Sequence, residues 1–179
     1  MRALVVYESM FGNTQAVALA VSEGIAMRMP VDIIEVGDAP AVLPPDVALL
    51  VVGGPTHAHG MTSPKSRADA AQRAGDRLVS RGDGVREWLD TLRPVAQPIA
   101  AAAFDTRIKG PELLWGSAAK SVTKRLRGIG FQLVQPPRSF IVAGPTGPLF
   151  DRLVDGEPER ARTWGEAVAG AVAAPVGAR

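Results

Sequence analysis

The residues best able to do chemistry at short spacing lie between positions 9 and 14, which read Ser9-Met10-Phe11-Gly12-Asn13-Thr14. Gly12 allows a tight turn and a close approach of the backbone to a ligand. If a helix begins at Asn13, its free N–H groups and its dipole favour an anion. The hydroxyls of Ser9 and Thr14 add hydrogen-bonding capacity. The segment alone leaves two interpretations open, a phosphate site built mainly from neutral donors and an ordinary capped turn.

Two further segments carry polar groups at the ends of apolar runs. The first is Gly53-Gly54-Pro55-Thr56-His57, followed closely by His59, and the second is Asp105-Thr106-Arg107. His57 and His59 are the only histidines in the chain, and histidine is the side chain that ordinarily titrates near neutral pH. Two histidines at this spacing, with no cysteine and no third ligand, do not favour a metal site, and we predict none.

The elements that must position these segments alternate between strand and helix along the whole chain. Strands are predicted at 2–7, 31–36, 47–52 and 99–105, with a fifth, interrupted strand at 131–135 and 139–142; helices are predicted at 13–28, 85–92, 117–129 and 160–173. Continuously apolar strands are typical of parallel sheets that are buried on both faces. We therefore expect an α/β fold, a three-layer doubly wound sandwich around a five-stranded parallel sheet. Ligands in such folds bind beyond the carboxyl ends of the strands, where all three polar segments fall.

The remaining stretch, about 57–84, is the least regular and is rich in arginine. We expect an extended surface loop there, with a weak helix over 68–79. A loop of this length beside a site can also act as a lid or a binding loop. No repeat or linker divides the chain, so residues 1–179 are expected to form one domain.

Composition excludes several classes of protein. The chain of 179 residues has no cysteine, which removes disulfides, iron–sulfur clusters and thiol catalysis. A net charge of only +2 and an aromatic content of 5% disfavour a nucleic-acid binder. No apolar run reaches the length of a membrane span and no secretory leader is visible, so we expect a cytoplasmic protein without an integral membrane segment.

The segment 9–14 resembles the phosphate loop of flavodoxins, Thr/Ser-x-Thr-Gly-x-Thr, which wraps the phosphate of flavin mononucleotide (FMN). Gly53-Gly54-Pro55-Thr56 is similar to the Gly-x-Pro-Thr turn of flavodoxin-like quinone reductases, and the order of elements over the whole chain also fits. The resemblance implies a flavodoxin-like sheet of strand order 2-1-3-4-5 with FMN as the cofactor. It implies a cofactor site formed by Ser9, Met10, Phe11, Gly12, Asn13, Thr14, Pro55, Thr56, His57, His59, Asp105, Thr106 and Arg107.

The chain departs from the family pattern at three points. Phe11 replaces the middle hydroxyl of the phosphate loop, and Glu8 places a carboxylate just before that loop, which we expect to point away from it. The tyrosine that commonly covers the flavin ring is also missing, because the only tyrosine, Tyr7, falls inside a strand. His57, His59 and Trp115 are the candidate replacements.

The resemblance implies an FMN-binding redox protein that passes electrons to a protein partner or to a small acceptor such as a quinone. It leaves open whether the chain is a non-enzymatic carrier or an oxidoreductase that uses NAD(P)H. Typical carriers of this family are strongly acidic and this chain is not, which disfavours the ordinary carrier or implies a partner of different charge. The alternative is a flavodoxin-fold binding or regulatory domain that has lost its flavin, an interpretation that Phe11 and the missing tyrosine motivate.

Overall fold

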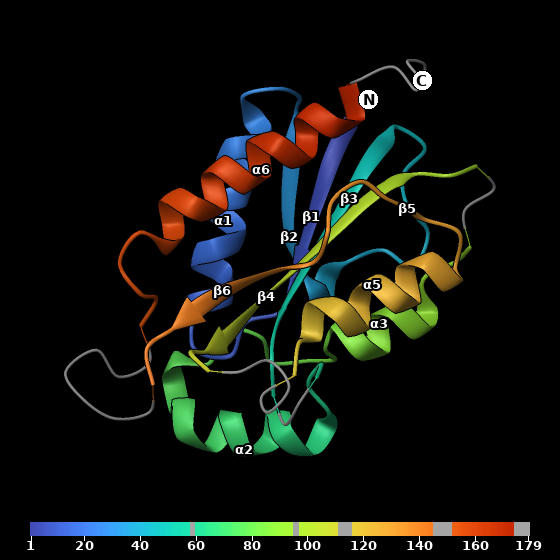
Figure 1. Ribbon diagram of the computed structural model, residues 1–179. Helices are drawn as coiled ribbons and strands as arrows, with labels where there is room; N and C mark the ends of the chain where they lie inside the picture. The colour runs from blue at the N-terminus through green and yellow to red at the C-terminus, as the bar shows by residue number, and fades with distance from the viewer. Residues whose placement is uncertain (58–59, 95–96, 111–115, 145–151, 174–179) are drawn as a thin grey trace.

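A parallel sheet forms the centre of the molecule (Figure 1). The computed structural model describes residues 1–57, 60–94, 97–110, 116–144 and 152–173. The strands are β1 (Arg2–Tyr7), β2 (Val31–Glu35), β3 (Val47–Pro55), β4 (Ala100–Ile108), β5 (Gln132–Leu133) and β6 (Arg138–Val142). Their order is β2-β1-β3-β4-β5, and β6 also pairs with β4. The predicted strand order is therefore confirmed.

The far edge of the sheet is one strand in two pieces. β5 pairs with Ala100 and Ala101 of β4, whereas β6 pairs with the stretch from Phe104 to Ile108. Both pairings are parallel and both lie on the same side of β4, away from β3. Pro136 and Pro137 separate the two pieces, as expected from residues that cannot donate to a strand ladder.

Helices cover both faces of the sheet. One layer consists of α1 (Asn13–Ala26) and α6 (Glu157–Ala173), and the other of α3 (Val85–Thr91) and α5 (Ala118–Gly128), as Figure 1 shows. α2 (Pro64–Ala74) lies across the end of the sheet toward which the strands point. Among the described residues, no helix combines the length and the apolar character that a membrane crossing requires.

Alternation along the strands sorts the apolar side chains into two cores. Leu4 and Val6 of β1 face the α3–α5 layer, whereas Val5 faces the α1–α6 layer. In the second core the rings of Phe104, Phe140 and Trp164 pack edge to face, with each pair of centroids 6.1 Å apart. Such aromatic pairs add about 1 kcal/mol each beyond the area that they bury.

The segment 57–84 differs from the extended loop that its composition predicts. α2 begins at Pro64, four residues before the predicted helix, because Ser63 and Ser66 form a reciprocal capping box and proline suits the first helical position. The helix ends at Gly75, whose φ of 55° breaks the helical path. The prediction of a weak helix over 68–79 was therefore wrong in its bounds.

Candidate functional site

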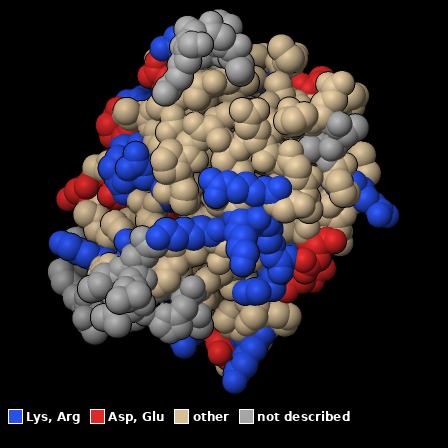
Figure 2. Space-filling view, turned by 45° about the vertical axis from the view of Figure 1, so that its right-hand side comes forward, with Lys and Arg blue, Asp and Glu red and all other residues tan. Residues whose placement is uncertain are grey.

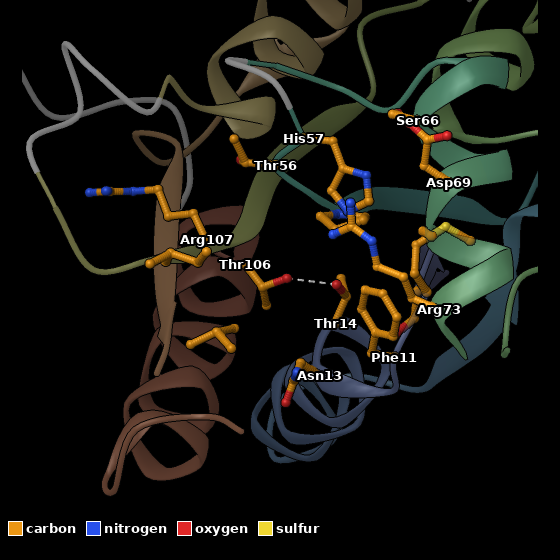
Figure 3. A pocket seen from close by; sticks show the side chains of 16 residues that line it. Phe11, Asn13, Thr14, Thr56, His57, Ser66, Asp69, Arg73, Thr106 and Arg107 are labelled. Atoms are coloured by element: carbon orange, nitrogen blue, oxygen red, sulfur yellow. Dashed lines mark hydrogen bonds between the residues drawn. The ribbon is translucent and has the colours of Figure 1, made fainter. Parts of the chain in front are cut away.

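A cavity of about 350 Å³ opens at the carboxyl ends of β1, β3 and β4, under α2 (Figure 3). Volumes of about 300–1,000 Å³ are usual for small-molecule sites. The cavity is lined by Ser9, Met10, Phe11, Asn13, Thr14, Pro55, Thr56, His57, Ser66, Asp69, Ala70, Arg73, Thr106, Arg107, Ile108 and Val142. It brings together all the cofactor residues predicted from the sequence except Gly12, Asp105 and His59. His59 lies outside the described residues, as does Trp115.

The loop from Ser9 to Thr14 is held firmly at its first residues. The N–H of Gly12 donates to Ser9 Oγ at 3.1 Å, and the backbone of Ser9 exchanges hydrogen bonds with Ser80, accepting at 2.8 Å and donating to its Oγ at 2.9 Å. α1 begins at Asn13 as predicted, with Gly12 before it at a φ of 90° and with no side-chain cap. The positive end of α1 therefore borders the cavity with no side-chain cap from Gly12.

Two threonines join the ends of α1 and β4 inside the cavity. The hydroxyls of Thr14 and Thr106 lie 2.7 Å apart, and both residues are almost fully buried. The Thr106 carbonyl accepts the N–H of Thr56 at 2.9 Å, while the Thr56 hydroxyl accepts the N–H of Ala118 at 2.9 Å. The three chain segments are thus fixed to one another, and the Thr56 side chain is committed to the start of α5.

Gly53 has a packing role at the end of β3. A Cβ on Gly53 would lie 2.0 Å from Cζ of Phe104, so the bare backbone makes room for that buried ring. Packing of the core therefore requires a glycine at the first of the two positions that resemble the family turn. Pro55 and His57, which follow it, line the cavity.

The Asp105 side chain points away from the cavity. It is fully buried, and its Oδ2 accepts hydrogen bonds from Ser117 Oγ at 2.6 Å and from the N–H of Ala119 at 2.9 Å. Because neighbouring residues of a strand face opposite sides, Thr106 takes the cavity side and Asp105 the α5 side. A contact of the Asp105 backbone with a cofactor remains a prediction.

Two cations line the cavity, Arg73 of α2 and Arg107 of β4, and α2 also contributes Asp69. The backbone of His57 pairs with that of Gly60 at 2.9 and 3.1 Å. Burial lowers the pKa of the His57 imidazole, the guanidinium of Arg73 lowers it further, and the Ser66 backbone partly opposes both. Figure 3 shows the Arg73 side chain reaching from α2 toward His57. A depressed pKa keeps the imidazole neutral at pH 7, so Arg73 and Arg107 carry the positive charge here.

The sequence analysis missed the contribution of α2 to the cavity. Ser66, Asp69, Ala70 and Arg73 line it and recur at the spacing of one helix face. Ser63-Pro64 was the available signal, because serine before proline is typical of a helix start.

A buried polar cluster attaches α2 and α3 to the end of β1. The carboxylate of Glu8, which is only 1% exposed, accepts Thr62 Oγ1 at 2.6 Å and the N–H of Val85 at 2.9 Å. Arg67 donates to Thr62 Oγ1 at 3.1 Å and pairs with Glu87 at 2.9 Å. Burial raises the pKa of Glu8, although the hydrogen bonds from Thr62 and Val85 and the charge of Arg67 oppose it. Glu8 therefore points away from the 9–14 loop, as expected.

Comparisons with known proteins support the fold. No protein-family model matches the chain, and no curated protein matches its sequence. A solved flavodoxin from the domain Archaea is 22% identical, with a TM-score of 0.63 over 96% of this chain and 99% of that one. Oxidised flavodoxin 2 from Bacillus cereus is 19% identical, with a TM-score of 0.64 over 95% and 99%. A flavodoxin, WrbA-like protein from Agrobacterium tumefaciens is 19% identical, with a TM-score of 0.53 over 96% of each chain. The chain therefore has the flavodoxin-like fold.

Proposed function

We propose that this protein binds FMN in the cavity and transfers electrons through it. The observation that carries the proposal is the convergence of the 9–14 loop, the open end of α1 and the ends of β3 and β4 around one cavity of about 350 Å³. The likeness to solved flavodoxins adds support at the level of the fold.

The donors around the cavity fit a phosphate monoester at one end and a planar ring at the other. The backbone of the 9–14 loop and the uncapped start of α1 would hold the phosphate, because free N–H groups and the helix dipole favour an anion there. Pro55 and the backbone near Thr106 would border the ring. The bound flavin would supply the redox chemistry, while the protein binds it, orients it and limits its contact with water.

The test is a titration of flavin-free protein with FMN, in which binding is monitored by flavin fluorescence. A parallel titration uses riboflavin. We expect FMN to bind much more tightly than riboflavin, because only FMN carries the phosphate. Gly12→Ala should weaken FMN binding by straining the loop, because Gly12 has a φ of 90°. The control is Gly130→Ala, beyond the end of α5, where φ is 98°. It should strain the chain similarly and leave FMN binding unchanged. If neither flavin binds, the proposal fails and a flavin-free binding or regulatory domain replaces it.

The surface beside the cavity favours an acidic protein as the electron partner. α5 carries four basic residues and no acidic one, namely Lys120, Lys124, Arg125 and Arg127. Figure 2 shows lysine and arginine side chains gathered on this side of the molecule. Asp90 of α3 pairs with Arg125, and Lys124 and Arg127 are exposed. Since α5 begins at the cavity edge, an acidic partner steered to it by charge would approach the proposed flavin.

A further inference from the structure

We propose that Arg73 of α2 is a phosphate-binding cation of the cavity, and that it makes the site selective for a phosphate monoester over its uncharged parent alcohol. The identity of the ligand as FMN rests on the proposed function. The assignment of Arg73 rests on the placement and charge of that side chain.

α2 presents Arg73 to the cavity in a defined way. The helix starts at the Ser63 capping box and ends at Gly75, and Arg73 stands in its last turn. Arg67, on a different side of the helix, is buried and pairs with Glu87 of α3, which attaches α2 to the body of the protein. A long side chain on a fixed helix loses less entropy on binding than one on a free loop.

The charge of Arg73 is not neutralised by an ion pair within the described part of the chain. Asp69 precedes it by one turn and lines the same cavity, but the two side chains form no ion pair. In Figure 3 the Asp69 carboxylate points toward Ser66, and the guanidinium points toward His57. His57 lies close enough for that charge to lower its pKa. Among the residues that the structure describes, the cavity therefore offers a cation without an ion-pair partner beside a neutral imidazole.

Arg73 compensates chemically for what the phosphate loop lacks. Phe11 stands where the resembling loops have a hydroxyl, and it lines the same cavity as Arg73. A guanidinium presents several N–H donors in a planar fork that matches two phosphate oxygens. Its charge-assisted hydrogen bonds are stronger than the single neutral one that is lost.

Arg107 is the other cation of the cavity, and it is less suited to this role. Its Nη1 donates to the carbonyl of Gly110 at 2.9 Å, which holds the guanidinium against its own turn. It also stands at the end of β4, whereas the loop and the start of α1 belong to a different strand end. We therefore expect substitution of Arg107 to affect the phosphate less than substitution of Arg73.

The experiment compares Arg73→Gln with Arg77→Gln, which removes a charge just beyond α2 at a residue that does not line the cavity. Dissociation constants for FMN and riboflavin are measured by fluorescence at low and moderate salt. Arg73→Gln should weaken FMN binding about tenfold or more and leave riboflavin unchanged, since a charge-assisted contact of about 1.5 kcal/mol corresponds to tenfold. Its FMN affinity should also depend less on salt. The FMN affinity of Arg73→Lys should fall between those of Arg73→Gln and the unmodified protein. The FMN affinity of Arg77→Gln should match that of the unmodified protein.

Two results overturn the assignment. An unchanged FMN affinity in Arg73→Gln removes Arg73 from the site, and an equal loss for both flavins places it against the ring instead of the phosphate. If the unmodified protein binds no FMN, the proposed function fails separately. The role of Arg73 is then tested with inorganic phosphate alone. Phosphate should shift the NMR resonance of His57 in the unmodified protein and not in Arg73→Gln. Equal shifts in the two proteins, or no shift in either, would refute the assignment.

Discussion

The hydrogen bond between Thr14 and Thr106 gives the sharpest test of how the cavity is built. The two hydroxyls lie 2.7 Å apart and are nearly inaccessible to solvent. Thr→Val keeps the side-chain shape and removes the hydroxyl. Either single substitution leaves the other hydroxyl buried without that partner, which costs about 1–3 kcal/mol of unfolding free energy. Replacing both removes the two polar groups together, and the cost should be small.

The predicted result is therefore strong coupling in a double-mutant cycle. Thr14→Val and Thr106→Val should each lower the urea midpoint of the flavin-free protein by about 0.5–1.5 M, given a slope of about 2 kcal/mol per M. The double variant should lose clearly less than the sum of the two single losses. Thr123→Val is the matched control, because the Thr123 hydroxyl of α5 is buried with no partner in the described structure, and its removal should be neutral or stabilising. Additive losses in the cycle would refute the pairing.

Three other predictions follow from the charged groups. Burial raises the pKa of Glu8 above 4.5, so above that pH the folded state holds a proton that the unfolded state has released. The free energy of unfolding should therefore fall as pH rises from 4.5 through the folded-state pKa. Glu8→Gln should remove that fall, which denaturation at a series of pH values will measure. The pKa of His57, followed by NMR, should lie below 6.5 and should rise in Arg73→Gln, because the guanidinium is one of the groups that lower it. Lys124→Gln should slow electron transfer to an acidic cytochrome at low salt and leave transfer to a neutral quinone unchanged.

Each of these predictions has a control and a contradicting outcome. Glu23→Gln changes an exposed carboxyl of α1 and should keep the pH profile of the unmodified protein, while parallel profiles for Glu8→Gln would contradict the buried-carboxyl argument. If the His57 pKa is the same in Arg73→Gln and in the unmodified protein, the charge of Arg73 does not act on His57. Arg162→Gln changes an exposed cation of α6, on the opposite layer, and should leave the cytochrome reaction as it was. Equal effects of Lys124→Gln and Arg162→Gln on the rate of the cytochrome reaction would contradict the proposal that the partner docks on the basic face of α5.

The strands and most of the site could be predicted because their signals are local. Apolar runs fix the sheet, and parallel strands bring the segments that follow them to one edge, so Ser9, Pro55 and Thr106 meet around one cavity without being near in sequence. The direction of Asp105 was predictable by the same logic. It alternates with Thr106 along β4 and therefore faces α5.

α2 was poorly predicted because its buried face carries almost no apolar signal. The residues that it buries are Arg67, Ala70 and Ala74. An arginine and two alanines do not produce the periodic hydrophobic pattern from which amphipathic helices are recognised. What anchors the helix instead is the buried Arg67 side chain, which donates a hydrogen bond to Thr62 and forms an ion pair with Glu87 of α3. A tertiary contact of this kind cannot be inferred from the spacing of residues in the sequence.

That same helix bears on the departures from the flavodoxin pattern. The sequence alone makes Phe11 evidence for a lost cofactor, because a hydroxyl is missing from the loop. With α2 in place, the cavity that Phe11 lines also holds Arg73, a charged donor in addition to Arg107 of β4. Within the described residues, Arg73 forms no ion pair and lies beside the half-buried His57, whose pKa its charge lowers. The proposed role of Arg73 predicts that the site still binds an anion, and the comparison of FMN with riboflavin in Arg73→Gln tests that prediction.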